Sequence, residues 1–340
     1  MNRNRNTILS RLLVAALAGL VPTVAQADPP IESFLAGAPE GFIPPPLHPG
    51  DARLVTRPLG EGVYALLSGD VAVDNNGFVV GENGVLVIDA HINAQMAHQI
   101  QDAVREVTDK PIIYLVNTNY HGDHTFGNYA FPKTTVVVAH RRTAEQMRHF
   151  DLEKEFILPT VNDDRSVYAD AKLRLPDIVF DRYLRLDLGG RVVELYHFGP
   201  GNTLGDTVVY EPRTRTAWTG NLVLGEGTIP PLFEGGAPEY LKTVTRFAST
   251  LAVERIIPGH GAPTSGKTLG RYLRYLSDLI ASVRGTIAEG ATLEQALASM
   301  PLGERYLPPS DSPMAALRPF LQGLHRLNVQ RTYRDLLDQG

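Results

Sequence analysis

The sequence contains no cysteine among its 340 residues. Disulfide bonds and thiolate metal ligands are therefore excluded, so any metal ion must be held by histidine, carboxylate or amide side chains. Excess positive charge is missing as well: 32 Lys and Arg stand against 37 Asp and Glu, and the formal net charge is −5. Because nucleic-acid binding needs a clustered positive face, this balance argues against a nucleic acid as partner and favours a small-molecule substrate.

Long apolar runs are also missing. A membrane-spanning helix needs about 20 apolar residues, and no run in the sequence reaches that length. The apolar stretch 12–21 follows an arginine-bearing start and precedes Ala25-Gln26-Ala27. This order is typical of a signal peptide with its cleavage site. We predict a signal peptide over residues 1–27, a mature chain beginning near Asp28, and a periplasmic or secreted protein without a membrane span.

The rest of the chain divides into three segments by composition. Residues 28–53 are rich in proline and are predicted to form an extended N-terminal arm. Residues 54–265 alternate short apolar runs with amphipathic stretches, a pattern typical of an α/β domain. Residues 266–340 are predicted to form a C-terminal helical extension that packs on this domain.

The apolar runs within the domain predict its strands and helices. A spacing of four between apolar residues predicts a helix over 92–107, and further helices are expected before residue 148 and over 239–249. Strands are predicted at 62–67, 78–80, 84–88, 111–116, 134–138, 191–196, 207–210, 216–218 and 255–257.

The densest cluster of reactive side chains directly follows the predicted strand 111–116. It reads Asn119-Tyr120-His121-Gly122-Asp123-His124. Ligands in open α/β sheets bind beyond the carboxyl ends of strands, so this placement suits a site. In an extended chain Asn119, His121 and Asp123 share a face, and the turn that Gly122 permits would bring His124 to them.

This cluster resembles the H-x-H-x-D-H motif of the metallo-β-lactamase superfamily. Asp89, which closes the predicted strand 84–88, also fits that family. The resemblance covers about residues 54–265 and implies an α/β fold, an αββα sandwich of two mixed β-sheets with helices outside. Three later segments resemble the family's G-H-T-x-G-D, G-D-x and P-G-H-G motifs in the same order: Gly201-Asn202-Thr203-Leu204-Gly205-Asp206, Gly220-Asn221-Leu222 and Pro258-Gly259-His260-Gly261.

The resemblance implies two metal positions, and this sequence departs from the first. Three histidines form that position in the family, and here only His121 remains, because Asn119 and Asn202 replace the other two. Asn221 replaces the carboxylate that bridges the metals. Amide oxygen is a weaker zinc ligand than imidazole, so the first position is predicted to be degenerate. We expect about one zinc ion per chain, in the second position, where the family's ligands are kept: Asp123, His124 and His260.

These residues predict a metal-dependent hydrolase. A zinc-bound water would attack an amide, lactam, ester or lactone bond, with Asp123 and His121 as catalytic residues. His121 would act as a general base or orient the substrate. The main alternative is a catalytically inactive binding protein that keeps the fold and a vestigial metal site. An iron oxygenase would also use two histidines and a carboxylate, but the iron dioxygenases of this superfamily resemble one another in using the first-position histidines, mostly lost here.

Two other segments bear on the site. His91 follows Asp89 closely, and we expect a solvated loop histidine there. The Gly- and Pro-rich stretch 225–237 is either a substrate-facing loop, with Phe233 or Leu232 as an apolar contact, or an ordinary connection. The sequence predicts no particular oligomeric state.

Overall fold

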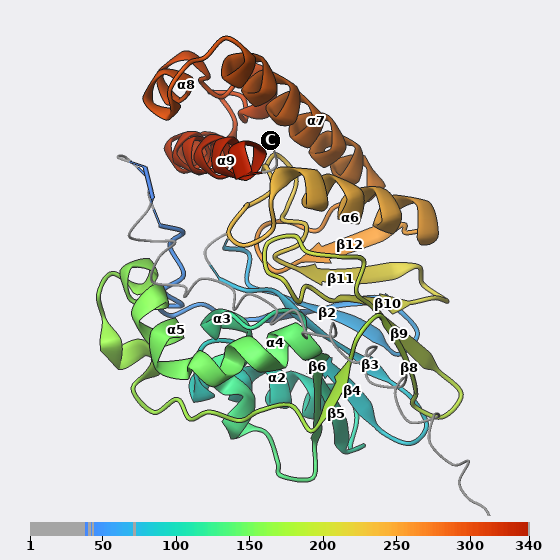
Figure 1. Ribbon diagram of the computed structural model, residues 1–340. Helices are drawn as coiled ribbons and strands as arrows, with labels where there is room; N and C mark the ends of the chain where they lie inside the picture. The colour runs from blue at the N-terminus through green and yellow to red at the C-terminus, as the bar shows by residue number, and fades with distance from the viewer. Residues whose placement is uncertain (1–37, 40–41, 43, 71–72, 339–340) are drawn as a thin grey trace, which may run out of the picture.

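The computed structural model describes residues 38–39, 42, 44–70 and 73–338. The predicted signal peptide and the first part of the predicted arm lie outside the described residues. Two β-sheets stack face to face, with helices on both outer sides (Figure 1). The predicted α/β sandwich with a C-terminal helical extension is confirmed.

The first sheet has seven strands in sequential order. Its first four strands pair antiparallel and its last four pair parallel, so the sheet is mixed. The strands are β1 (Val55–Gly60), β2 (Val63–Leu67), β3 (Asn76–Val80), β4 (Val85–Ile88), β5 (Ile112–Asn117), β6 (Val136–His140) and β7 (Ile178–Phe180).

The second sheet has five strands in the order β12-β11-β10-β9-β8. Only β11 and β12 pair parallel, and the other pairs are antiparallel. The strands are β8 (Tyr183–Asp187), β9 (Val192–Tyr196), β10 (Val208–Glu211), β11 (Thr216–Gly220) and β12 (Arg255–Pro258).

Apolar side chains from both sheets form the central core. Trp218 on β11 is fully buried there, and its Nε1 donates a hydrogen bond to the carbonyl of Asn76 at 3.3 Å. The indole lies so close to β3 that a Cβ on Gly77 would come within 2.2 Å of Nε1. A glycine is therefore required where the two sheets meet.

Helices cover the outer faces of the two sheets (Figure 1). The helix α2 buries one face against β2 to β6 and forms a second core with them. Asn93 caps the start of α2, because its side chain accepts a hydrogen bond from the backbone N–H of Met96. The helices are α2 (Ala94–Val107), α3 (Gly122–Thr125), α4 (Arg141–Gln146), α5 (Phe150–Ile157), α6 (Ala237–Thr250), α7 (Gly266–Ala288), α8 (Leu293–Ser299) and α9 (Arg318–Asp338).

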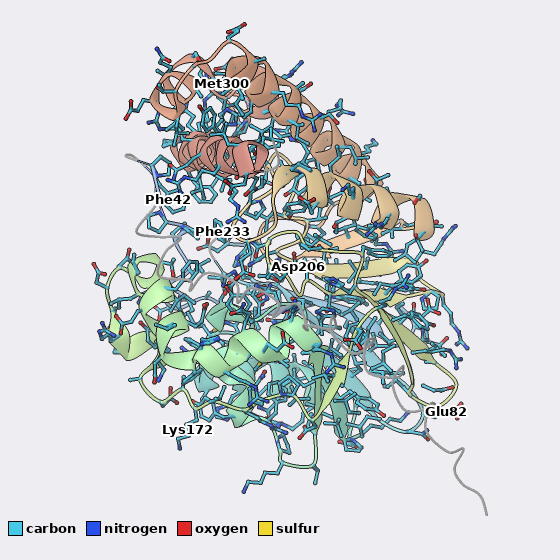
Figure 2. All side chains as sticks on the ribbon, in the orientation of Figure 1. Phe42, Glu82, Lys172, Asp206, Phe233 and Met300 are labelled. Atoms are coloured by element: carbon cyan, nitrogen blue, oxygen red, sulfur yellow. The ribbon has the colours of Figure 1, made fainter. Side chains whose placement is uncertain are left out.

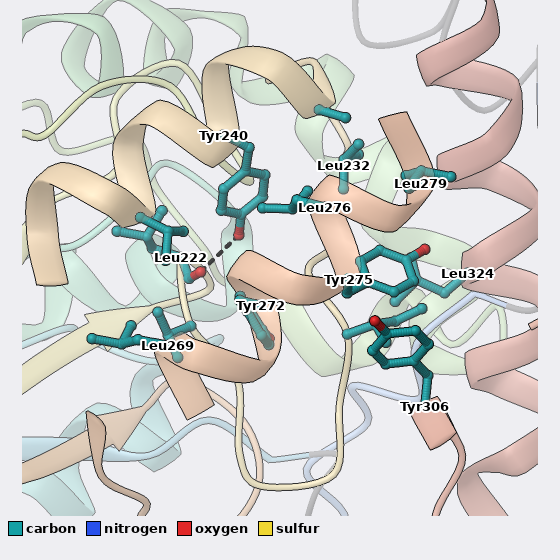
Figure 3. Close-up of a cluster of buried hydrophobic side chains, with 14 of the residues drawn as sticks. Leu222, Leu232, Tyr240, Leu269, Tyr272, Tyr275, Leu276, Leu279, Tyr306 and Leu324 are labelled. Carbon is teal, nitrogen blue, oxygen red and sulfur yellow. Dashed lines mark hydrogen bonds between the residues drawn. The ribbon is translucent and has the colours of Figure 1, made fainter. Parts of the chain in front are cut away.

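The C-terminal helices share one apolar core with the second sheet (Figure 3). Tyr240 on α6 donates a hydrogen bond from its hydroxyl to the carbonyl of Leu222 at 2.7 Å. Asn328 on α9 donates from Nδ2 to the carbonyl of Pro230 and to the hydroxyl of Tyr275. The extension is thus fastened to the loop that follows β11, and this fixes the position of that loop.

None of the helices in the described part of the chain is long and apolar enough to cross a membrane. The strands β1, β7 and β8 and the short helices α3 and α5 were not predicted from the sequence, in which the α3 segment was expected to form only a turn. The strand β1 carries mostly exposed side chains and a proline, so it lacks the apolar alternation of a half-buried strand. The strands β7 and β8 are also largely exposed, and α5 is short and rich in charge.

Candidate metal centre and its pocket

The residues of the predicted site come from loops at neighbouring strand ends. His121, Asp123 and His124 follow β5, while Asn221 and His260 follow β11 and β12. Gly122 permits the tight turn into α3, since a Cβ there would lie 2.6 Å from the ring of Phe126. The sequence argument for a glycine at this turn therefore agrees with the geometry.

The structure brings the three predicted zinc ligands together. Oδ2 of Asp123 lies 2.9 Å from Nε2 of His260 and 3.5 Å from Nε2 of His124. Burial would raise the pKa of Asp123, but the neighbouring His124 and His260 lower it below its usual range. The carboxylate therefore stays ionised, as a metal ligand must be.

A second carboxylate that the sequence argument missed belongs to the same centre. Ligand atoms of Asp74, His124 and His260 all lie within 4.8 Å of one another. Asp74 is almost fully buried, and burial raises its pKa well above the usual range against the opposing charge of His124. Asp74 lies two residues before β3, in a segment that resembles none of the family's motifs, so the sequence does not mark it as a ligand.

Asp89 fixes the orientation of His124. Its Oδ2 lies 2.9 Å from Nδ1 of the imidazole and accepts a hydrogen bond from the hydroxyl of Thr118 at 2.7 Å. The backbone of Asp89 has φ 58°, an uncommon conformation for a non-glycine residue that is retained here at the site. A carboxylate on one imidazole nitrogen orients the other nitrogen, so Nε2 of His124 is the atom that could bind a metal.

The centre fits a divalent cation. Several of its buried polar atoms have no hydrogen-bond partner within the described residues: Asp74 Oδ1, Asp123 Oδ1, His124 Nε2, Asn221 Oδ1 and His260 Nδ1. Each such atom costs roughly 1–3 kcal/mol when buried and unsatisfied. The carboxylates of Asp74, Asp89 and Asp123 also lie close enough to repel one another, and a dication would offset this repulsion. The donor set of imidazole and carboxylate suits zinc.

The asparagines of the first position offer few ligand atoms for a second metal. Oδ1 of Asn119 accepts a hydrogen bond from the backbone N–H of His121 at 2.8 Å, which leaves Nδ2 as the buried atom without a partner. An amide N–H donates and cannot coordinate a cation. Nδ2 of Asn202 donates a hydrogen bond to the carbonyl of Pro231, and its Oδ1 has no partner among the described residues. One imidazole and one amide oxygen remain, which is a weak ligand set.

The loop that carries Asn202 is held by its own motif. Asp206, marked in Figure 2, accepts hydrogen bonds from the backbone N–H and the hydroxyl of Thr203 at 3.0 and 2.8 Å. Burial raises the pKa of Asp206 to about 7. The aspartate of the G-H-T-x-G-D resemblance is thus a support for the loop.

His121 has a buried acidic partner that sequence reasoning did not find. Oε1 of Glu153 on α5 lies 3.2 Å from Nδ1 of His121 and accepts from the backbone N–H of Gly122 at 3.0 Å. Burial lowers the pKa of His121, but the charge of Glu153 outweighs this effect, so that the pKa of His121 is raised. The ring of Phe156 stacks on the imidazole at 5.2 Å. Glu153 follows His121 by 32 residues in the sequence and lies in a segment without a motif. The sequence therefore gives no signal for it.

The expectation of a solvated His91 is wrong. The residue is 1% exposed and has φ 65°. Its Nδ1 accepts from the backbone N–H of Ile92, and burial lowers its pKa to about 3. His91 is therefore neutral, because the charge of Asp123, which favours protonation, does not outweigh the effect of burial.

A cavity of about 50 Å³ opens beside the centre. This volume holds several water molecules, since one water needs roughly 10–15 Å³. Both polar residues of the centre and apolar side chains line the cavity. Phe233 lines this cavity, which agrees with the first of the two alternatives for the stretch 225–237. Leu232 is buried in the core instead. The lining comprises Pro45, Leu47, His121, Asp123, Glu153, Phe156, Ile157, Thr160, Asn202, Asn221, Leu224, Pro231, Phe233, His260 and Phe320.

Comparison with known proteins agrees with this geometry. Residues 70–260 match the profile of the family described as the metallo-beta-lactamase superfamily. The match covers more than half of the chain, and the chain therefore belongs to this superfamily.

Three solved structures illustrate the similarity of fold. A metallo-beta-lactamase from Pontibacter korlensis is 17% identical, with a TM-score of 0.54 over 66% of this chain and 99% of that chain. The metallo-beta-lactamase FIM-1 from Pseudomonas aeruginosa, in its mono-zinc form, is 19% identical, with a TM-score of 0.54 over 68% of this chain and 97% of that one.

The sec-alkylsulfatase Pisa1 from Pseudomonas sp. matches a longer part of the chain. It is 15% identical, with a TM-score of 0.63 over 84% of this chain, and the chain spans 50% of the sulfatase. A match over 84% of the chain is too long to fit within residues 1–265. It therefore includes part of the C-terminal helices as well as the superfamily domain.

Proposed function

We propose that this protein is an exported hydrolase that depends on one zinc ion and cleaves an amide, lactam, ester or lactone bond. The observation that carries the proposal is the set of buried carboxylate and imidazole atoms that lack partners and lie together beside an open cavity. Membership of a superfamily of mostly metal-dependent hydrolases supports it.

Asp123, His124 and His260 would hold the ion, and Asp74 adds a further carboxylate within ligand distance. A zinc ion bound there would supply a Lewis acid that polarises the scissile carbonyl and lowers the pKa of a water ligand. Asp89 would keep the proton of His124 on Nδ1, so that the lone pair of Nε2 remains available to bind the metal.

The chain's own residues would carry the proton transfer. Glu153 holds a proton on Nδ1 of His121, which leaves Nε2 as an acceptor in the cavity wall. Nε2 has no partner among the residues that the structure describes, so it is free to take a proton from the attacking water. Asn202 and Asn221 would donate or accept hydrogen bonds to the substrate.

Metal analysis and a substrate panel test the proposal together. The purified protein should contain about one zinc and hydrolyse at least one member of a panel of esters, lactones, amides and β-lactams. A chelator should remove both the metal and the activity, and added zinc should restore both. A protein that binds no zinc after loading and hydrolyses nothing would instead be the inactive binding protein.

The export part of the proposal rests on residues outside the described structure and has its own test. Mass spectrometry of the periplasmic or secreted protein should give an N-terminus near Asp28. An intact Met1 on that material would contradict export by cleavage.

A further inference from the structure

Among the described residues, the cavity beside the metal centre has no lysine or arginine in its wall, and its two histidines, His121 and His260, are already paired with Glu153 and Asp123. Both of these partners are acidic. A buried anionic group needs a paired cation, because moving an unpaired charge out of water costs several kcal/mol or more. Away from the metal, this cavity therefore disfavours a carboxylate or sulfate on the substrate.

A second, smaller cavity continues the apolar wall. The two cavities share Pro45, Phe156, Thr160 and Phe233. Phe42, Pro44 and Pro159 complete the second one, which has a volume of about 10 Å³ and no charged side chain. Figure 2 shows Phe42 and Phe233 on the same side of the molecule, between α9 and α5. The two cavities together form an apolar path that leads away from the metal centre.

Segments outside the superfamily match build this path. Residues 44–47 enter from the N-terminal side, and the backbone N–H of Leu47 donates to the carbonyl of Thr160 at 2.7 Å. Phe320 enters from α9 at the other end of the chain. The predicted arm and the predicted helical extension thus both contribute side chains to the wall of the cavity.

We propose that the substrate is an uncharged carboxylic ester or lactone whose apolar chain lies along this path, from Phe233 toward Phe42. This inference rests on the proposed hydrolase function. In the reaction, the oxygen of water bonds to the acyl carbon and the bond from that carbon to the alcohol oxygen breaks. One proton of the water passes to the alcohol, and the carboxylic acid releases the other to solvent.

Chain length and charge test the proposal in the zinc-loaded protein. The substrates are the para-nitrophenyl esters of acetate, butanoate, hexanoate and octanoate, with the mono-para-nitrophenyl ester of suberate as the charged equivalent of the last. The value of kcat/KM should rise roughly tenfold for each added pair of methylenes until the path is filled. The suberate ester should react about a hundredfold more slowly than the octanoate ester. Equal or faster reaction of the suberate ester would overturn the proposal.

Two variants locate the effect in the path. Phe42→Ala should reduce kcat/KM about tenfold more for the octanoate ester than for the acetate ester, because only the longer chain reaches Phe42. Phe320→Lys should raise kcat/KM for the suberate ester about tenfold, because it puts a cation at the half-buried wall. Gln322→Lys adds the same charge at an exposed position of α9 and is the matched control. If both lysine variants act alike, the selectivity does not arise in this cavity.

A binding measurement separates this proposal from the hydrolase function itself. Methyl octyl ketone is not hydrolysed, and its ω-carboxy derivative differs only by the terminal charge. Calorimetry on the zinc-loaded protein should show binding of the ketone and at least about tenfold weaker binding of the derivative. If no ester is hydrolysed but the ketone binds selectively, the hydrolase function fails and the apolar path stands. If the derivative binds as well as the ketone, the path is wrong.

Discussion

Nδ1 of His121 lies 3.2 Å from the carboxylate of Glu153, and both side chains are buried beside the metal centre. In the superfamily this histidine position belongs to the first metal. Here the partners needed for that role are asparagines, and the imidazole has a carboxylate partner instead. This pairing supports the proposed role of His121 as a proton acceptor rather than a metal ligand.

His121→Ala and His124→Ala separate these two roles. The first variant should lower kcat by about a hundredfold while zinc stays bound, because only the proton acceptor is lost. The second should lose both zinc and activity, since a ligand is removed. Elemental analysis of both proteins decides the matter. Loss of zinc in both would mean that His121 is a ligand and that the one-metal account is wrong.

Glu153→Gln tests the pairing itself. The charge of Glu153 raises the pKa of His121 against the effect of burial. Without that charge the pKa of His121 falls, so the acidic limb of the kcat/KM profile should move to lower pH. Glu153→Asp keeps the charge and should move the limb less. An unchanged profile for Glu153→Gln would show that another group controls this limb.

Asp74→Cys tests whether Asp74 reaches the metal. The protein itself has no cysteine, so the variant has only one. A thiolate-to-cobalt charge-transfer band in the cobalt-loaded variant would therefore report contact between cobalt and the side chain at position 74 alone. Thr125→Cys is the control, because Thr125 is buried next to His124 but its hydroxyl donates to the carbonyls of Tyr120 and His121. We expect the band in the first variant only. Its absence there, with cobalt bound, would place Asp74 outside the coordination sphere.

His325 predicts a pH dependence of stability. Its Nδ1 lies 2.8 Å from the hydroxyl of Tyr275 and its Nε2 lies 3.0 Å from the carbonyl of Met300. Burial lowers the pKa of His325 to about 4. The unfolded chain therefore binds a proton more readily, and about 3 kcal/mol of stability present above pH 6.5 is lost as the pH falls toward 4.

Urea unfolding of His325→Gln between these pH values checks this expectation. The variant should show a flatter pH dependence than the parent, because an amide does not titrate. His98→Gln removes an exposed histidine from α2 and should change nothing. Parallel pH curves for the parent and His325→Gln would refute the assignment.

The sequence predicted those features that are local or carried by motifs. The apolar runs located the core strands, and the motif loops located Asp123, His124 and His260. Asp74 and Glu153 could not be found in the same way, because each reaches the site through tertiary packing from a segment without a motif. His91 was misjudged because the burial of a short loop depends on what packs over it.

We expect Asn119, Asn202 and Asn221 to prevent metal binding in the first position, so that one functional centre remains. Asn119→His and Asn202→His, combined with Asn221→Asp, would restore three imidazoles and a bridging carboxylate. Calorimetric titration with zinc should give a stoichiometry of one for the parent and two for this triple variant. Two zinc ions in the parent, or none, would contradict the account, as would a triple variant that still binds only one.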